Sequence, residues 1–86
     1  MNKTIYILSD GEYTNIGTTE RLLPTLVDMQ DGNARVIEVI YAEQMENADE
    51  VKKQLHKRLD DFRMAEEWFA LTEARLKELV KELKRV

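Results

Sequence analysis

The sequence predicts a small α/β domain in which helices flank a three-stranded antiparallel sheet. Three observations lead to this fold class: an apolar–turn–apolar pattern at the N-terminus, a β-branched run in the middle, and two amphipathic helical stripes in the second half. The expected element order is ββαβαα. The 86 residues suffice for one hydrophobic core, so we expect residues 1–86 to form a single domain.

The first two strands are expected to form a hairpin, with residues 3–8 on one strand and 12–17 on the other. Asp10-Gly11 separates two β-prone runs, and both residue types tolerate the positive φ that tight turns require. Such a hairpin places Tyr6 beside the segment Asn15-Ile16-Gly17 on the neighbouring strand.

A short helix and a third strand should follow the hairpin. The apolar positions of the helix are spaced for one face: Leu22, Leu23, Leu26 and Met29. Because proline lacks an N–H, the helix either begins near Pro24 or is kinked there. Gly32 is the natural residue for a left-handed cap. Residues 35–42, RVIEVIYA, read as a strand with few polar gaps, which suits a strand covered on both sides more than an edge strand.

Two helices are expected in the second half of the chain. Asn47 with Glu50 fits a capping box, and the stripe that follows is Ala48, Val51, Leu55, Leu59 and Phe62. Residues 63–70 are expected to be a connection ending in two core-capping aromatics, Trp68 and Phe69. Thr72 should cap the last helix, whose stripe is Leu76, Leu79, Val80 and Leu83; its last turns carry Lys81, Lys84 and Arg85, where positive charge suits the helix dipole.

Composition narrows the classes of function. The chain has no cysteine, which removes disulfides and thiolate metal sites. No apolar run reaches the roughly 18 residues of a membrane span, and no signal pattern opens the chain, so we expect a cytoplasmic protein with no membrane partner. Residues 1–46 carry three bases against eight acids, a net charge of −5. This negative charge argues against nucleic-acid binding as the main function, because such proteins usually concentrate Lys and Arg to neutralise the phosphate backbone.

Five short motifs together resemble one known family. They are Thr4-Ile5-Tyr6, Asn15-Ile16-Gly17, Met29-Gln30-Asp31-Gly32-Asn33, Leu55-His56 and Glu66-Glu67-Trp68-Phe69. In this order and spacing the chain resembles the GIY-YIG nuclease superfamily, and more closely its phage-type minimal branch. The resemblance covers nearly the whole chain, and it implies the GIY-YIG fold.

The resemblance also implies where a nuclease site would lie. Tyr6 matches the tyrosine that acts as general base or positions the nucleophile. Asn15 stands where the family has a Tyr or Lys, and asparagine can be neither a base nor a cation. Thr25 stands where the family has the arginine that stabilises charge on the phosphate. Arg21 lies about one helical turn away and could compensate only if Pro24 re-aims it.

The metal position departs from the family pattern as well. Counting back four residues from His56, the family's metal-binding glutamate falls on Lys52, a cation where Mg²⁺ requires oxygen. Asp49 and Glu50 are not obvious substitutes. Glu67 retains the family's late polar position. Losing both the metal and the phosphate cation removes the groups that neutralise charge during phosphodiester hydrolysis, so no metal cofactor is expected.

Three function classes remain open. The first is a non-catalytic binding protein of a phage or mobile element, acting in the host cytoplasm on a protein with a basic surface, such as a nucleic-acid-processing or host-defence complex. The second is a Mg²⁺- or Mn²⁺-dependent endonuclease using Tyr6, Arg21, His56 and Glu67. The third is a nucleic-acid binder without cleavage. The residues expected to bind a partner are Asn15, Thr25, Lys52, Lys53, Lys57 and Arg58.

Simpler structural roles compete with these functional ones. A tyrosine in a strand such as Tyr6 is more often a packed aromatic than a catalytic group. His56 lies at the edge of an apolar stripe, and a structural role is favoured for it, since no second His and no Cys completes a metal site. The basic cluster around Lys53 and Lys57 is flanked by acids and reads as a solvated helix surface. The stripe of the last helix could also serve a homodimer, so the oligomeric state stays open.

Overall fold

Five antiparallel strands form the central sheet in the computed structural model, which describes residues 2–84. The strands are β1 (Lys3–Ser9), β2 (Thr14–Thr19), β3 (Glu38–Met45), β4 (Arg63–Ala65) and β5 (Trp68–Phe69). The helices are α1 (Leu22–Asp31), α2 (Ala48–Arg58) and α3 (Glu73–Lys84), with a 3₁₀ turn η1 (Asp60–Phe62). The predicted α/β class is confirmed, whereas the predicted three-stranded sheet is wrong. Among the described residues, no helix is long and apolar enough to cross a membrane.

The N-terminal hairpin forms with the predicted pairing. Tyr6 lies opposite Gly17, and Ile7 lies opposite Ile16. Its connection is longer than a two-residue turn, because β2 begins only at Thr14. Gly11 takes the positive φ of 95°. The carboxylate of Asp10 holds the loop instead, since its Oδ1 accepts hydrogen bonds from the backbone N–H groups of the two residues before β2, at 2.9 and 2.7 Å.

The sheet order is β3-β1-β2-β5-β4, which places β3 at an edge. This corrects the expectation of a strand covered on both sides. The run begins outside the strand, because Val36 is 82% exposed and β3 starts only at Glu38. A register shift opposite Ile7 and Leu8 then interrupts the alternation of side chains along β3. The dense apolar run therefore reflects an irregular edge strand.

The predicted connection at residues 63–70 contains the two missed strands. β4 and β5 pair with each other, and β5 continues the sheet beyond β2. Glu66 makes the tight turn between them with a φ of 45°. Phe69 is fully buried, as expected of a core aromatic, and Trp68 is half-buried. Strands of three and two residues are too short to show a period-two pattern.

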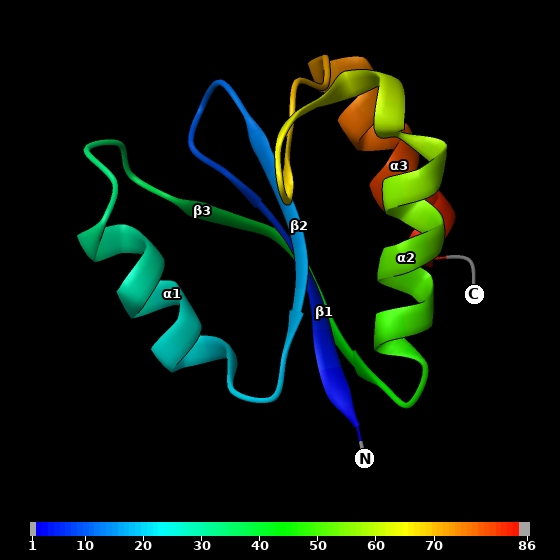
Figure 1. Ribbon diagram of the computed structural model, residues 1–86, viewed down its shortest axis with the longest axis horizontal. Helices are drawn as coiled ribbons and strands as arrows, with labels where there is room; N and C mark the ends of the chain where they lie inside the picture. The colour runs from blue at the N-terminus through cyan, green and yellow to red at the C-terminus, as the bar shows by residue number, and fades with distance from the viewer. Residues whose placement is uncertain (1, 85–86) are drawn as a thin grey trace.

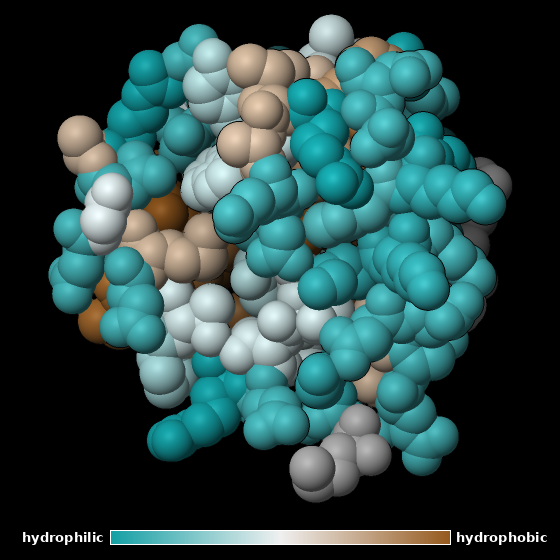
Figure 2. Space-filling view, viewed as in Figure 1, coloured by the Kyte–Doolittle hydropathy of each residue, from teal (hydrophilic) through white to brown (hydrophobic). Residues whose placement is uncertain are grey.

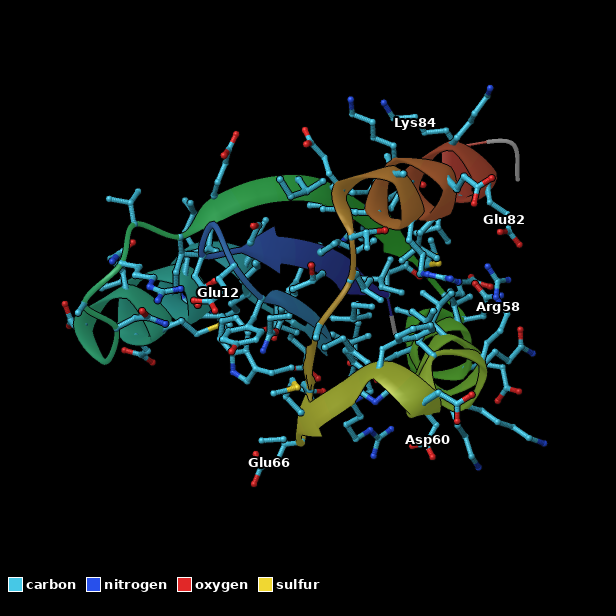
Figure 3. The ribbon with its side chains drawn as sticks, turned by 90° about the horizontal axis from the view of Figure 1, so that it is seen from above. Glu12, Arg58, Asp60, Glu66, Glu82 and Lys84 are labelled. Atoms are coloured by element: carbon cyan, nitrogen blue, oxygen red, sulfur yellow. The ribbon has the colours of Figure 1, made fainter. Side chains whose placement is uncertain are left out.

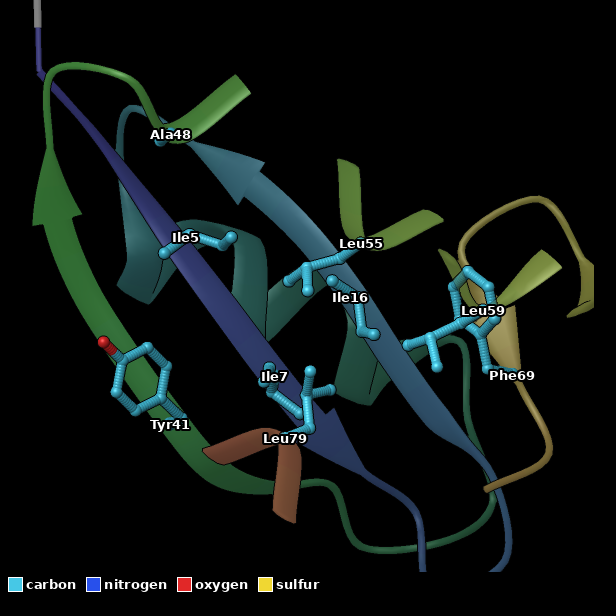
Figure 4. Packing of buried hydrophobic residues seen from close by; sticks show 9 residues of the cluster. All are labelled: Ile5, Ile7, Ile16, Tyr41, Ala48, Leu55, Leu59, Phe69 and Leu79. Carbon is cyan, nitrogen blue, oxygen red and sulfur yellow. The ribbon is translucent and has the colours of Figure 1, made fainter. Parts of the chain in front are cut away.

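The helices form layers on opposite sides of the sheet, with α1 on one side and α2 and α3 on the other (Figure 1). The core lies on the α2 and α3 side, where alternate strand residues meet the helix stripes (Figure 4). Its buried members are Ile5, Ile7, Ile16, Tyr41, Ala48, Leu55, Leu59, Phe69 and Leu79. The predicted stripe of α3 is therefore confirmed, and that of α2 as far as Leu55; Leu59 and Phe62 pack on the same core from beyond the end of α2.

The helix ends agree with the predictions in part. α2 begins after Asn47 as expected, but the Asn47 side chain makes no capping hydrogen bond. Thr72 does cap α3, since its Oγ1 accepts the Arg75 N–H at 3.2 Å. Lys81 and Lys84 lie in the last turn of α3. The prediction for Arg85 lies outside the described residues.

Helix α1 begins at Leu22, so Pro24 lies in its first turn. The first four N–H groups of a helix have no partner within the helix, so a proline there removes no hydrogen bond. The predicted left-handed cap is wrong, because Gly32 has a φ of −90°. No residue of α1 is fully buried. This helix is the least embedded of the three.

Candidate functional site

Tyr6 and Glu67 meet over Gly17 on the α1 side of the sheet. Tyr6 alternates with Ile5 and Ile7 along β1, which point into the core on the other side, so its ring faces α1. Glu67, in the turn before β5, reaches the same place from the outer edge of β2. Its backbone oxygen accepts the N–H of Ile16 at 3.0 Å. The structure thus joins two sequence-predicted residues that are far apart in the chain.

Glycine is required at position 17. A Cβ atom there would lie 2.7 Å from the Cζ of Tyr6, closer still to its hydroxyl oxygen, and 3.1 Å from Oε1 of Glu67. Carbon atoms in proteins essentially never approach so closely. The tyrosine ring can therefore lie flat against β2 only because position 17 has no side chain.

Burial and the nearby carboxylate both act on the Tyr6 hydroxyl. Tyr6 is 4% exposed. This desolvation raises the pKa of its phenol above the ordinary value of 10.0, and the negative charge of Glu67 raises the pKa further. Both effects keep the hydroxyl protonated near neutral pH. The group can donate a hydrogen bond there, but it is not poised to act as a phenolate.

Lys52 completes this group from α2. Its Nζ lies 3.2 Å from Oε2 of Glu67, and both side chains are about one-third exposed, at 29% and 35%. Lys52 is the residue that stands where the resembled family has its metal-binding glutamate. Here its ammonium group forms an ion pair with the carboxylate that the family pattern retains. The positive charge beside Glu67 is thus the ammonium group of Lys52.

The residues present do not fit a divalent metal at this position. Among residues 2–84, no cluster of three or more His, Cys, Asp or Glu side chains could hold one. Glu67 is already paired with a cation, and Lys52 offers three N–H donors and no acceptor. A hard cation such as Mg²⁺ needs several oxygen ligands, which this group does not supply.

His56 has a structural role at the edge of β2. Its Nε2 lies 2.8 Å from the backbone oxygen of Ile16. A carbonyl oxygen can only accept, so Nε2 donates this hydrogen bond and is not free to bind a metal. The ring also packs edge-on against Phe69, with centroids 5.0 Å apart. Both contacts agree with the structural role expected for His56.

Thr25 and Arg21 lie where β2 leads into α1. The hydroxyl groups of Thr25 and Thr19 lie 2.8 Å apart, and Thr25 also donates to the backbone oxygen of Arg21 at 2.9 Å. These contacts tie α1 to the end of β2. Arg21 precedes the helix and is exposed.

Asn15 is buried beside this group. It is 3% exposed, and its Oδ1 has no hydrogen-bond partner among the described residues. An unpaired buried acceptor costs free energy, and each such atom calls for an explanation. A water molecule or a polar group of a ligand would satisfy it.

The predicted basic cluster on α2 divides into two parts. Arg58 is bound by α3, because its two terminal nitrogens each donate to Glu82 at 2.7 Å (Figure 3). Lys53 and Lys57 are exposed on the outer side of the helix. The cluster is therefore partly a helix–helix contact and partly a solvated surface.

Two structural residues were not anticipated. Asp49 binds the two N-terminal strands, since it accepts hydrogen bonds from Lys3 Nζ at 2.8 Å and from the Thr18 hydroxyl at 2.6 Å. These hydrogen bonds lower the pKa of Asp49. Gln30 fixes the loop after α1 through both ends of its amide, at Arg35 and Ile37. Only its place in the Met29–Asn33 motif marked Gln30 in the sequence.

Comparison with known proteins identifies the family. The T5orf172 domain model matches residues 3–84, which include every element described above. No curated protein and no solved structure matches the chain. The chain belongs to the T5orf172 domain family, a phage T5-derived domain family.

Proposed function

We propose that this chain is a non-catalytic binding protein built on a GIY-YIG-like scaffold. The observation that carries the proposal is the ion pair between Lys52 and Glu67, 3.2 Å apart beside the Tyr6 hydroxyl. By the sequence resemblance, Lys52 stands where the resembled nucleases have their metal-binding glutamate. A nuclease of that type needs the metal for Lewis-acid assistance and for stabilising the leaving group.

The GIY-YIG-like scaffold is supported by the way its motifs come together. Tyr6 of the first motif packs directly on Gly17 of the second. Glu67 of the last motif reaches the same place, and the helix that carries Lys52 and His56 closes the edge of β2. A chance resemblance would not require the separate motifs to meet at one point.

The partner that we propose is a protein with a basic surface. The first half of the chain, which supplies β1, β2, α1 and β3, carries a net charge of −5. An acidic surface can complement a basic groove and speed association with it. Membership of a phage-derived family is consistent with a small phage protein that occupies a host nucleic-acid-processing or defence complex.

A plasmid-nicking assay with Mg²⁺ and with Mn²⁺ tests the non-catalytic role. We expect no nicking by the wild type above that of a Tyr6→Phe variant prepared in the same way. The Phe variant keeps the ring over Gly17 and removes only the hydroxyl. Nicking by the wild type that is lost in Tyr6→Phe would overturn the proposal in favour of the endonuclease.

The same preparation tests nucleic-acid binding without cleavage. Exposed Lys53 and Lys57 are the residues available for phosphate contacts on α2. Such binding would weaken steeply with added salt, because phosphate neutralisation releases counterions. We expect no binding of DNA or RNA at low salt; binding that Lys53→Gln with Lys57→Gln abolishes would replace the protein-partner proposal.

A further inference from the structure

We propose that the outer side of α1 and the loop that follows it form a docking surface for a basic, apolar segment of a partner protein. This α1 surface consists of Leu23, Val27, Val36 and Val39, with Asp28 and Asp31 at its border. The inference deepens the proposed binding role and rests on it, since it names the surface and the chemistry of its occupant.

Exposed apolar side chains concentrate on this surface. Leu23 is 74% exposed, Val27 59% and Val36 82%. Figure 2 shows apolar side chains around a hollow on the α1 side, while hydrophilic side chains cover the α2 side. Two residues of this surface, Val27 and Val39, line the same pocket, and exposed apolar side chains that gather in this way mark interaction sites on soluble proteins. The large exposed apolar residues are unevenly distributed, because Met64 on β4 is the one such residue elsewhere among the described residues.

A shallow pocket of about 240 Å³ lies between α1 and β3. Its lining residues are Leu26, Val27, Gln30, Ile37 and Val39. The Gln30 side chain fixes the pocket's wall, because Oε1 accepts the Ile37 N–H at 2.8 Å and Nε2 donates to the Arg35 oxygen at 2.8 Å. The pocket is thus formed before any partner arrives, which lowers the ordering cost of binding an apolar anchor.

The charge beside the apolar residues is negative. Asp28 and Asp31 are exposed near the C-terminal end of α1, and the last turn of this helix contains no base. Carboxylates at that end oppose the helix dipole and weaken the helix, so helix stability does not explain them. Arg35, the nearest following base, is bound by Glu12 in an ion pair. The surface therefore fits lysines or arginines that flank apolar anchors.

A second copy of this chain is a poorer occupant. A two-fold dimer through the α1 surface would bring the same patch from both copies together. The interface would then hold Asp28 and Asp31 of both copies, which is four carboxylates. Like charges across an interface cost binding free energy. A basic partner segment avoids this repulsion.

A peptide titration tests the surface directly. The probe is a short capped peptide with leucines on one helical face and lysines beside them; its control replaces every lysine with glutamate. Binding is followed by backbone amide chemical shifts of the labelled protein. We expect the lysine peptide to shift amides of α1 and residues 33–39, and the glutamate peptide to leave them unchanged.

Matched variants assign the site. Val27→Lys should weaken binding of the lysine peptide about tenfold. Met64→Lys is the matched control, because Met64 is 58% exposed and Val27 59%. This variant should leave binding of the lysine peptide unchanged. The double variant Asp28→Asn with Asp31→Asn should weaken binding of the lysine peptide about fivefold. This effect is smaller than that of Val27→Lys, because an exposed pair of opposite charges contributes little binding free energy. The same double variant should unfold at no lower temperature than the wild type, since it relieves the helix end.

The outcomes separate this inference from the non-catalytic role. Equal loss in Val27→Lys and Met64→Lys, shifts confined to other elements, or no binding at millimolar peptide would overturn the docking surface. A homodimer in sedimentation equilibrium that Val27→Lys dissociates would overturn it too, because a second copy would then cover the patch. None of these results depends on the nicking assay, which tests the non-catalytic role alone.

Discussion

The two sides of the sheet differ in how tightly their helices pack. On the α2 and α3 side, Ile5, Ile7 and Ile16 are fully buried beneath two helices. On the other side, α1 has no buried residue and exposes Leu23 and Val27. Hydrophobic stabilisation is roughly proportional to the apolar area removed from water, so one side supplies most of the stability. The other side is left free to carry the candidate site and the α1 surface.

This division follows from the alternation of side chains along one strand. In β1, Ile5 and Ile7 enter the core, while Tyr6 faces α1 and contacts Gly17. The same strand therefore fixes the fold with one set of residues and the site with the other. Changes at the exposed residues of α1 should therefore cost the fold less than changes in the core.

Matched leucine truncations should give the largest difference between the two sides. Leu55→Ala, on α2, removes a side chain that is 6% exposed and should lower the free energy of unfolding by about 2–5 kcal/mol. Leu26→Ala, on α1, should lower the free energy of unfolding by only about 1 kcal/mol, because Leu26 is half-buried and folding removes less of its apolar area from water. Urea denaturation measures both. Equal costs would contradict the division.

Substitution of Gly17 should test the packing beneath the site. Gly17→Ala forces the Tyr6 ring to move and should destabilise the protein by about 1–3 kcal/mol. In a Tyr6→Phe background the cost should fall by at least about 0.5 kcal/mol, because the hydroxyl is the nearest atom to the new methyl group. The four proteins form a double-mutant cycle in urea. A coupling of zero would mean that the Tyr6 hydroxyl does not lie against position 17.

A smaller, pH-dependent effect is expected at the hairpin loop, which belongs to neither helix layer. Burial pushes the pKa of Asp10 upward, but hydrogen bonds from the Tyr13 and Glu12 amides and the charge of Arg35 outweigh it and lower the pKa. A carboxyl group with a lowered pKa stabilises the fold above its ordinary value of 3.8, and this contribution is lost as pH falls through the folded-state pKa.

Asp10→Asn keeps an acceptor oxygen and removes the charge, so it isolates this contribution. At pH 7 the variant should be about 1 kcal/mol less stable than the wild type, and the difference should shrink as the pH falls below about 4. Thermal unfolding between pH 3 and pH 7 provides the measurement. A difference that stays constant with pH would show that the charge of Asp10 is not involved.

The sequence predicted the parts of the fold that carry strong local patterns. The hairpin, which sets Tyr6 beside the segment Asn15-Ile16-Gly17, and the apolar residues of the last two helices that pack on the core were confirmed. Strands β4 and β5 were missed, because three- and two-residue strands have no detectable period and exist only through pairing. β3 was taken for a covered strand because its apolar run extends into the preceding loop.

The candidate site could be predicted only one residue at a time. Tyr6, Lys52 and Glu67 were each marked by their places in the motifs, but nothing local showed that Lys52 and Glu67 form an ion pair across 15 residues. The contacts of Asp49 with Lys3 and Thr18 are likewise tertiary. Sequence spacing marked Lys52 as a departure from the resembled pattern, whereas the structure was needed to show which side chain Lys52 contacts.

Calorimetric titration with Mn²⁺ tests most directly whether Lys52 has taken the place of a metal. The wild type should give no binding heat, and Lys52→Glu, which sets a second carboxylate beside Glu67, should gain Mn²⁺ binding while remaining folded. Adding Thr25→Arg would then restore the charge pattern of the resembled nucleases. Mn²⁺ binding by the wild type that is lost in Glu67→Gln would contradict the account.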